Sequence, residues 1–291
     1  MTTLQKPSPC KVNLLLNILG KRPDGFHELE TVFHPVKFFD QLTFERSGNG
    51  IQLTCSDAAL PVDASNLVYR AAAKFLETAG IRDGVRIHLE KHIPVAAGLG
   101  GGSGNAAITL LGLNELFGQP MPVAQLQVIA ASLGSDINFF LQEKPALAVG
   151  RGEQIEAVEH FSALRGASFF LIHPGFGIST PWAYRELARF PTAQNGQPGR
   201  ARRLIEKLQA GDLVAAAPEF YNSLEAPALE KYPVLALYQE FFRAHGAAAT
   251  LMSGSGSTTF ALFQKPSEAE AMLEKFPGRF GPPGWMAAVP V

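Results

Sequence analysis

The sequence predicts an α+β fold in two domains, and three observations lead to this prediction. A chain of 291 residues has room for one or two domains, each with a core of its own. Strand-like apolar segments and amphipathic helices occur in both halves of the chain. The pattern of elements restarts near residues 150–165. We therefore expect one domain over residues 1–155 and a second over residues 156–291.

The first half of the chain mixes strands and helices. The expected strands are apolar segments that end at turn residues, and they lie within 8–20, 36–55, 85–90 and 146–153. The expected helices repeat apolar residues every three or four positions and span 66–79, 103–117 and 123–133. In the first of these helices, Ser65 or Asn66 can serve as the N-cap, and Gly80 can end the helix.

The second half opens with an apolar strand over residues 167–173. Pro181, just after Ser179 and Thr180, then predicts the start of a capped helix. Residues 191–201 are rich in Pro, Gly and polar side chains, so we expect an exposed loop there. The elements expected after it are three helices and a strand–turn–strand unit, over 201–210, 212–221, 234–245 and 248–263.

The most informative stretch is a glycine loop that leads from an expected strand into an expected helix. Residues 94–110 read PVAAGLGGGSGNAAITL, with four glycines among residues 98–102. The backbone N–H groups of such a loop and of the first helical turn form a site for an anion, most commonly polyphosphate. Ser103 and Asn105 stand where a cap or a phosphate contact belongs. The loop has neither the Gly-Lys-Ser/Thr ending of a Walker A motif nor the third glycine of a dinucleotide fingerprint.

Two charged residues interrupt apolar segments. Lys11 lies in the strand 8–20, where it either extends to solvent at the strand start or meets an anion. Asp136 stands between a glycine turn and an apolar run. It either caps a helix or provides a carboxylate that can orient or deprotonate a hydroxyl group.

Two turns are open to a structural and a functional interpretation. Phe26 and His27 follow a Pro-Asp-Gly turn, and they either pack within a hairpin or offer a stacking face and a hydrogen-bonding edge to a nucleobase. The alternating Ser-Gly turn at 253–257 is either a tight hairpin or a second contact for an anion.

The composition is that of an ordinary globular protein, with 46% hydrophobic and 18% charged residues. A net charge of −1 gives no reason to expect binding to nucleic acid or to a membrane surface. Two cysteines, Cys10 and Cys55, predict a reducing compartment rather than a disulfide framework. We find no apolar signal core at the start and no apolar run near the ~20 residues of a membrane span. We therefore expect a cytoplasmic protein.

Three sequence blocks, in a fixed order, resemble a known family. They are Pro9–Leu14, the loop 94–107 and Leu251–Ser257. This order resembles that of the GHMP kinases, which include galactokinase, homoserine kinase and mevalonate kinase. The block Arg22–Phe33, with its Asp-Gly-Phe-His sequence, resembles within that superfamily the kinases of 4-diphosphocytidyl-2-C-methyl-D-erythritol (CDP-ME). The likeness covers nearly the whole chain.

The resemblance implies a two-domain GHMP kinase fold with the ATP and substrate cleft between its domains. It implies phosphoryl transfer from ATP to the 2-hydroxyl of CDP-ME in the methylerythritol phosphate route to isoprenoids. Its implied catalytic residues are Lys11 and Asp136. The implied ATP contacts are Pro94, Val95, Ala96, Ala97, Gly98, Leu99, Gly100, Gly101, Gly102, Ser103, Gly104, Asn66, Leu67 and Lys91. The implied substrate contacts are Asn13, Phe26, His27, Asp136, Thr180 and Tyr184, with the pair at 26–27 and Tyr184 on the cytosine.

The chain departs from the family pattern at two positions. Cys10 replaces the usual Ala, and Gly104 replaces the second Ser of the loop. Mg²⁺ is expected with ATP, but no protein ligand is assigned, because Gly104 removes one hydroxyl group and leaves Ser103 as the candidate. The resemblance further implies a monomer or weak homodimer in a bacterial cytoplasm.

Two alternatives are kept beside this interpretation. The first is another GHMP kinase, acting on homoserine or mevalonate, and the Phe26–His27 pair argues against it. The second is a nucleotide sensor that has the same fold without catalysis. The presence of both Lys11 and Asp136 argues against the second alternative.

Overall fold

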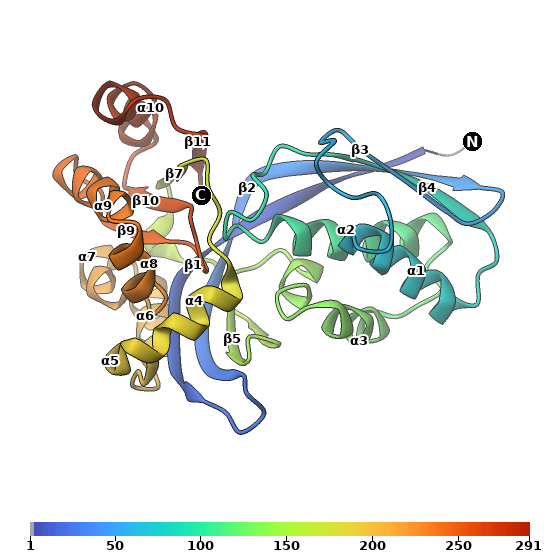
Figure 1. Ribbon diagram of the computed structural model, residues 1–291, viewed down its shortest axis with the longest axis horizontal. Helices are drawn as coiled ribbons and strands as arrows, with labels where there is room; N and C mark the ends of the chain where they lie inside the picture. The colour runs from blue at the N-terminus through green and yellow to red at the C-terminus, as the bar shows by residue number, and fades with distance from the viewer. Residues whose placement is uncertain (1–2) are drawn as a thin grey trace. The chain divides into compact units, whose positions relative to one another are not determined.

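The structure, a computed structural model, describes residues 3–291, and the chain divides into two compact units (Figure 1). The segments of the first unit are 3–10, Phe38–Ile93 and Gly100–Glu143. Those of the second are Lys11–Lys37, Pro94–Leu99 and Lys144–Val291. Both units are discontinuous in sequence, and the chain passes between them within its first two strands and within the glycine loop. The domain boundary near residue 155 stays a prediction.

The first unit places helices on one face of a sheet (Figure 1). Its strands are β3 (Ile51–Cys55), β4 (Gly84–Glu90) and parts of two long strands, β1 (Thr3–Lys21) as far as Cys10 and β2 (His27–Ser47) from Phe38 onward. They lie in the order β3-β4-β2-β1, with β4 antiparallel to β2 and parallel to β3. The helices are α1 (Leu67–Ala79), α2 (Gly101–Leu116) and α3 (Val123–Leu133), followed by a 3₁₀ turn, η1 (Asn138–Leu141).

Helix α2 lies close to the sheet because it presents a glycine to it. A Cβ atom at Gly112 would come within 2.6 Å of the Phe44 ring, so a larger residue would push the helix away. Phe44 of β2, Phe75 of α1 and Leu110 of α2 are all fully buried. This packing fixes the helix that follows the glycine loop.

Local sequence signals predicted α1 and α3 well. Asn66 caps α1 by accepting a hydrogen bond from Val68 N–H, and Gly80 ends it with a φ of 64°. Helix α2 differs from its prediction, since it begins at Gly101 rather than near Ser103. Ser103 therefore lies inside the first turn and does not cap the helix.

The second unit contains a sheet in the order β11-β7-β10-β9, with every neighbouring pair antiparallel. Its strands are β7 (Ser168–His173), β9 (Ala249–Met252), β10 (Thr259–Phe263) and β11 (Trp285–Pro290). Two helices, α9 (Val234–Ala244) and α10 (Pro266–Phe280), cover one face (Figure 1). Phe170 of β7 packs against Phe242 and Phe276 of these helices, and all three are fully buried.

The second unit contains further short elements, two of which pair with β1 or β2. They are β5 (Ala146–Gly150), β6 (Gln154–Ala157) and β8 (Tyr221–Asn222), with helix α4 (Thr180–Glu186) and the 3₁₀ turns η2 (Ser162–Leu164) and η3 (Leu187–Arg189). Strand β5 pairs with Leu29–Phe33 of β2, and β8 pairs in parallel with β1. As predicted, Ser179 caps α4, and proline stands in its first turn.

Residues 191–201 are only in part the exposed loop that their composition predicts, since residues 195–199 form no helix or strand but the residues on either side are helical. They contain the short helix α5 (Pro191–Gln194) and lead into α6 (Arg200–Gln209). Buried Glu30 accepts hydrogen bonds from two backbone N–H groups at the start of α6, at 2.9 and 3.1 Å. Buried Asn17 donates to the same segment at 2.9 Å. These partners are remote in sequence, so composition alone could not reveal them.

The helix predicted over residues 212–221 is shorter in the structure. The stretch forms α7 (Leu213–Ala216), the 3₁₀ turn η4 (Ala217–Glu219) and then β8. Pro218 has no N–H group to continue a helical hydrogen-bond pattern, which accounts for the early end. Helix α8 (Glu225–Lys231), which the sequence analysis did not predict, follows β8.

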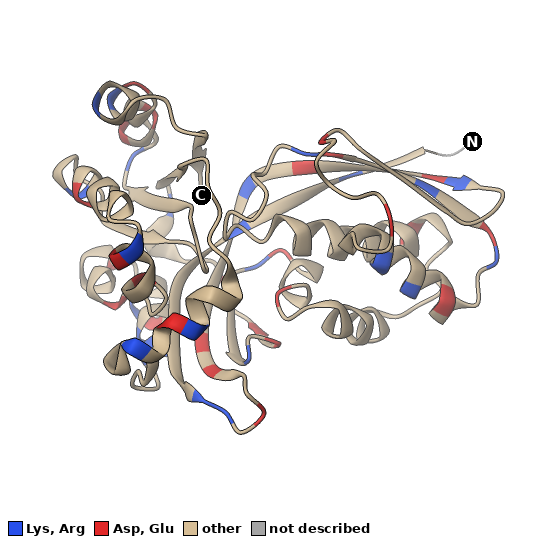
Figure 2. Ribbon diagram, in the orientation of Figure 1, with Lys and Arg blue, Asp and Glu red and all other residues tan. Residues whose placement is uncertain are grey.

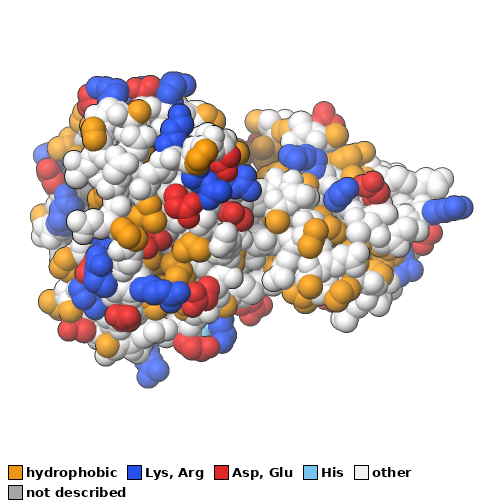
Figure 3. All heavy atoms as spheres, turned by 90° about the horizontal axis from the view of Figure 1, so that it is seen from below, with side chains coloured by type: hydrophobic (Ala, Val, Ile, Leu, Met, Phe, Trp, Pro, Cys, Tyr) orange, Lys and Arg blue, Asp and Glu red, His pale blue; other side chains and the backbone are white. Residues whose placement is uncertain are grey.

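The surface is mixed in charge. Helix α3 carries no charged residue and is drawn entirely in tan in Figure 2. Acidic and basic side chains are intermixed over the face seen in Figure 3. Across residues 3–291, none of the helices combines the length and the apolarity that crossing a membrane requires. Over the same residues, His, Cys, Asp and Glu side chains do not gather in threes as a metal site would need.

Candidate active site

Lys11 is buried in the part of β1 that belongs to the second unit. The residue is 3% exposed, so its side chain does not extend into solvent. Its Nζ atom donates to Oδ1 of Asn13 at 2.6 Å and to the carbonyl oxygen of Gly98 at 3.0 Å. Nζ also lies 5.3 Å from the centroid of the Phe33 ring. The backbone N–H of Lys11 donates to the carbonyl oxygen of Leu99 at 2.9 Å, so backbone and side chain are both fixed against the loop.

Asn13 is held by the neighbouring strand. Its Nδ2 atom donates to Oγ1 of Thr31 at 2.8 Å, and that hydroxyl group donates to the carbonyl oxygen of Leu15 at 2.5 Å. This arrangement assigns the amide orientation, with the oxygen of Asn13 facing Lys11. The structure therefore brings two of the predicted site residues into direct contact.

The Ser-Gly turn between β9 and β10 packs against the same group. A Cβ atom at Gly254 would lie 3.1 Å from the carbonyl oxygen of Gly98 and 3.4 Å from Nζ of Lys11. A Cβ atom at Gly98 would lie 2.0 Å from the carbonyl oxygen of Ser253. The hydroxyl group of Ser253 donates to Gly98 O at 3.0 Å. Glycine is required at both positions for this close backbone approach.

The first half of the glycine loop, Pro94–Leu99, belongs to the second unit. The N–H of Thr258 donates to the carbonyl oxygen of Ala97 at 3.2 Å, which ties the loop to the start of β10. Ala96 has a φ of 53°, unusual for a residue with a Cβ atom. Val95 is 47% exposed, whereas Leu99 is buried.

Helix α4 carries two predicted substrate contacts one turn apart. Oγ1 of Thr180 lies 2.8 Å from Oγ of Ser255 in the Ser-Gly turn. The ring of Tyr184 lies 5.1 Å from that of His27, centroid to centroid. Because residues at i and i+4 share a helix face, α4 joins the turn to the start of β2.

His27 and Phe26 differ in their surroundings. Nε2 of His27 is buried and has no hydrogen-bond partner among residues 3–291. Burial, and to a smaller degree the charge of Lys21, lowers the pKa of His27, which favours a neutral imidazole. Phe26 is 54% exposed, and the guanidinium of Arg151 lies 4.7 Å from its ring centroid. His27 thus presents a polar ring edge that has no hydrogen-bond partner among residues 3–291, and Phe26 presents an accessible aromatic face.

In the first unit, the start of α2 is open to an anion. Gly100 precedes the helix with a φ of 70°, and no side chain caps the first turn. The first helical backbone hydrogen bond runs from Gly104 N–H to Gly100 O at 2.9 Å. The N–H groups of Gly101, Gly102 and Ser103 come before it, at the positive end of the helix dipole.

The three residues implied for the adenosine site have structural contacts of their own. Asn66 donates from Nδ2 to Pro61 O at 2.7 Å while it caps α1. A Cβ atom added at Gly102 would lie 3.7 Å from Cδ1 of Leu67, so Leu67 lies beside the first turn of α2. Nζ of Lys91, with a side chain 7% exposed, forms a close ion pair with Asp40. The structure therefore places all three in the first unit, and their contact with adenosine stays a prediction.

Asp136 lies in the turn between α3 and η1 and is partly buried. The 3₁₀ turn η1 begins after Ile137, so Asp136 stands just before its N-cap position. This position does not decide between the two interpretations that the sequence left open. The catalytic role of Asp136 stays a prediction.

Comparison with known proteins identifies the family to which this chain belongs. The family model "GHMP kinases N terminal domain" matches residues 66–143, and "GHMP kinases C terminal" matches residues 201–282. The 4-diphosphocytidyl-2-C-methyl-D-erythritol kinase of Syntrophus aciditrophicus (strain SB) is 42% identical to this chain over 272 residues, which cover 92% of this chain and 94% of the relative. This chain belongs to the CDP-ME kinase family of the GHMP kinases. It is thus an ATP-dependent small-molecule kinase.

Solved structures agree with membership of this family. A crystal structure of 4-(cytidine 5'-diphospho)-2C-methyl-D-erythritol kinase superposes with a TM-score of 0.80 at 34% identity, covering 99% of this chain and 100% of that chain. A homoserine kinase from Cytophaga hutchinsonii ATCC 33406 has a TM-score of 0.73 at 20% identity, covering 99% of this chain and 93% of that chain, and it shares the fold alone.

The departure of this chain from the CDP-ME kinase pattern at residue 104 has a packing reason. A Cβ atom at Gly104 would lie 2.7 Å from the carbonyl oxygen of Pro9 and 3.1 Å from Oγ of Ser8. The contact with β1 therefore leaves little room for a side chain at residue 104. It leaves Ser103 as the hydroxyl group of the first turn.

Sequence reasoning missed Asp40, which organises the start of α2. Asp40 is fully buried and accepts hydrogen bonds from the N–H groups of His92 (2.7 Å) and Ile93 (2.9 Å), besides its ion pair with Lys91. Nδ2 of Asn105 in α2 donates to it at 2.9 Å. A carboxylate within an apolar strand was the available signal, of the same kind that singled out Lys11.

Proposed function

We propose that this chain transfers the γ-phosphoryl group of ATP to the 2-hydroxyl group of CDP-ME, a step in the synthesis of isoprenoid precursors. The observation that carries the proposal is the similarity to CDP-ME kinases over 92% of the chain. The local sequence that distinguishes these kinases, Arg22–Phe33, forms the turn and strand that present Phe26 and His27.

The nucleotide end of the acceptor is assigned to His27, Phe26 and Tyr184. A neutral imidazole has one donor and one acceptor nitrogen, so it can hydrogen-bond the edge of a cytosine. The unpaired Nε2 atom of His27 supports this role, because a buried polar atom without a partner is costly unless a ligand satisfies it. The exposed ring of Phe26 supports stacking on the base.

The phosphate end of the donor is assigned to the glycine loop and the start of α2. Free N–H groups at a helix start bind phosphate oxygens, and the uncapped first turn fits that role. Mg²⁺ usually binds through substrate phosphates and few protein ligands. Ser103 is the proposed protein contact for the ion.

Phosphoryl transfer requires positioning and charge stabilisation more than covalent chemistry from the protein. Lys11, oriented by Asn13 and Gly98, is proposed to stabilise negative charge on the transferred group. Asp136 is proposed to orient the acceptor hydroxyl group and to take its proton. Asn13 and Thr180 are proposed to line the acceptor site.

We also propose that the protein acts in a bacterial cytoplasm as a monomer or weak homodimer. Cys10 and Cys55 are not in a disulfide bond, which supports a reducing compartment. Sedimentation velocity over a range of protein concentrations would test the oligomeric state.

The deciding experiment is coupled ADP release by the purified protein with ATP, Mg²⁺ and CDP-ME, beside homoserine and mevalonate. We expect turnover with CDP-ME alone, and competition by cytidine nucleotides. Turnover with homoserine or mevalonate instead would refute the cytosine assignment. Binding of ATP without turnover of any acceptor, with no effect of D136N, would favour a nucleotide sensor.

A further inference from the structure

A short segment of the second unit links the Ser-Gly turn to the strand that carries Lys11. This segment, residues 221–225, comprises β8 and the start of α8. It pairs in parallel with β1 at Leu15 and Leu16. The N–H of Ser223 donates to Leu16 O at 2.8 Å, and the hydroxyl group of Ser223 accepts from the backbone of β1 at 2.9 Å. The segment is therefore fixed to β1 independently of the turn.

Asn222 connects this segment to the turn. Its Nδ2 atom donates to the carbonyl oxygens of Met252 at 2.7 Å and Gly254 at 2.8 Å, on either side of Ser253. Its Oδ1 atom accepts from Leu224 N–H at 2.9 Å. The residue is 1% exposed, so water does not compete for these bonds. A single buried amide thus fixes the backbone on both sides of Ser253.

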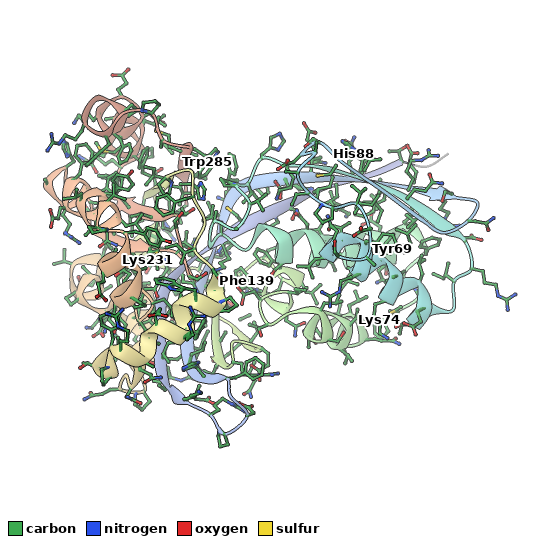
Figure 4. The ribbon with its side chains drawn as sticks, viewed as in Figure 1. Tyr69, Lys74, His88, Phe139, Lys231 and Trp285 are labelled. Carbon is green, nitrogen blue, oxygen red and sulfur yellow. The ribbon has the colours of Figure 1, made fainter. Side chains whose placement is uncertain are left out.

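Glu225 holds the strand end from which the turn starts. Its Oε1 atom accepts from Met252 N–H at 2.7 Å and from Nε2 of Gln239 at 2.6 Å. Gln239 is a buried residue of α9, so the carboxyl group joins two helices to β9. Helix α8 is anchored at its other end by Lys231, labelled in Figure 4, whose Nζ atom lies 4.3 Å from the ring centroid of Trp182.

We propose that Asn222 and Glu225 are positioning residues for phosphoryl transfer, and that they act on Lys11 through the Ser-Gly turn. The turn meets Lys11 at Gly254, where even a Cβ atom would lie 3.4 Å from Nζ. It also holds Gly98, whose carbonyl oxygen accepts from Lys11. A small displacement of the turn therefore moves the ammonium group, and reaction rates depend steeply on such displacements. This inference rests on the proposed function for its rate measurements.

The first test compares N222D with the matched variant N114D. The new carboxylate in N222D cannot donate to the two carbonyl oxygens that it faces. Asn114 makes similar bonds far from the turn in sequence: Nδ2 donates to Met121 O at 3.0 Å, and Oδ1 accepts from Met121 N–H at 3.1 Å. We expect N222D to lower kcat about tenfold or more while KM for ATP and CDP-ME stays within about threefold.

N114D loses one donated bond at a partly buried site, so it should lose less thermal stability than N222D. It should keep kcat within about twofold, because its contacts do not involve the turn. The inference is overturned when N222D keeps wild-type kcat, or when N114D loses as much kcat as N222D. Assays at a temperature well below both unfolding midpoints separate the loss of rate from the loss of folded protein.

Glu225 gives a second test that does not depend on N222D folding. E225Q keeps an oxygen that can accept from Met252 and Gln239, whereas E225A removes it. We expect kcat near wild type for E225Q and about tenfold lower for E225A, with little change in KM. Equal kcat in E225A and wild type would contradict the role of Glu225.

Amide hydrogen exchange tests the same inference without turnover. Residues 251–258 should exchange faster in N222D and E225A than in wild type, with β7 unchanged. Unchanged exchange in this segment overturns the inference whatever acceptor the enzyme uses. Failure of the wild-type protein to phosphorylate CDP-ME would overturn the proposed function instead, so the two failures are distinguishable.

Discussion

Two buried lysines, Lys91 in the first unit and Lys11 in the second, are held in different ways. Lys91 contacts the carboxylate of Asp40, so a full negative charge neutralises it within the unit. Lys11 donates to the amide oxygen of Asn13 and to the peptide oxygen of Gly98, so its own strand and the glycine loop orient its ammonium group. An ion pair with a fully buried carboxylate serves the scaffold, whereas an ammonium group oriented at the glycine loop can stabilise charge that develops in a reaction. Disrupting the contacts of Lys91 should therefore lower the unfolding free energy, whereas replacing Lys11 should lower kcat.

The largest expected effect is on stability, when Asp40 is removed. D40A leaves the charge of Lys91 and two backbone N–H groups buried without their acceptor. Loss of one partner of a buried pair costs about 3–5 kcal/mol of unfolding free energy. Urea denaturation measures this change, and D40N, which keeps the size and one acceptor oxygen, should lose less.

The matched control for D40A is an exposed ion pair in the same unit. Lys74, labelled on α1 in Figure 4, lies 3.0 Å from Glu77, and both side chains are largely in solvent. K74M should change the unfolding free energy by less than about 0.5 kcal/mol. If D40A were as mild as K74M, the ion pair would contribute little to the scaffold and the contrast between the two lysines would fail.

The next effect is on rate, when Lys11 is replaced. K11M keeps the apolar stem of the side chain and removes only the charged end. We expect kcat to fall about 10²–10³-fold, the usual cost of removing one preorganised electrostatic contact, with a smaller loss of stability than in D40A. Steady-state kinetics and urea denaturation on the same preparation check both statements. A variant with kcat within about tenfold of wild type would place Lys11 with Lys91 as a structural residue.

The features that sequence predicted are those set by neighbouring residues. The capped helix α1, with Asn66 at one end and Gly80 at the other, depends on contacts within a few residues. The bond from Asn222 to Met252 spans 30 residues, and the ion pair of Lys91 with Asp40 spans 51. Each such partner is defined only when the chain folds. Lys11 was found from its cost in an apolar strand, and Asp40 could have been found by the same reasoning.

A third buried charge extends the comparison to pH. Burial raises the pKa of Glu225 from 4.5 to about 7, although hydrogen bonds from Met252 and Gln239 and the charge of Arg243 act in the opposite direction. The folded state therefore keeps a proton that the unfolded chain releases. This contribution to stability is complete below pH 4.5 and is lost as pH rises through about 7. A shift of this size corresponds to about 3 kcal/mol.

The variant E225Q isolates that contribution, because glutamine does not titrate. We expect the unfolding free energy of wild type, measured relative to E225Q, to fall by up to about 3 kcal/mol between pH 4.5 and pH 8. Other titrating groups cancel in this difference. Parallel stability curves for the two proteins would show that Glu225 ionises in the folded state as it does in the unfolded chain.

The smallest effect tests how closely the helix start is packed in the first unit. A Cβ atom at Gly104 meets the backbone of Pro9 at 2.7 Å, whereas one at Gly102 meets only Leu67, at 3.7 Å. G104A should therefore cost about 1–3 kcal/mol by overpacking. G102A should gain about 0.5–1 kcal/mol from helix propensity. Thermal unfolding of both variants measures the contrast. If G104A were as stable as G102A, α2 could move away from β1, and packing would no longer explain why this chain lacks a serine at residue 104.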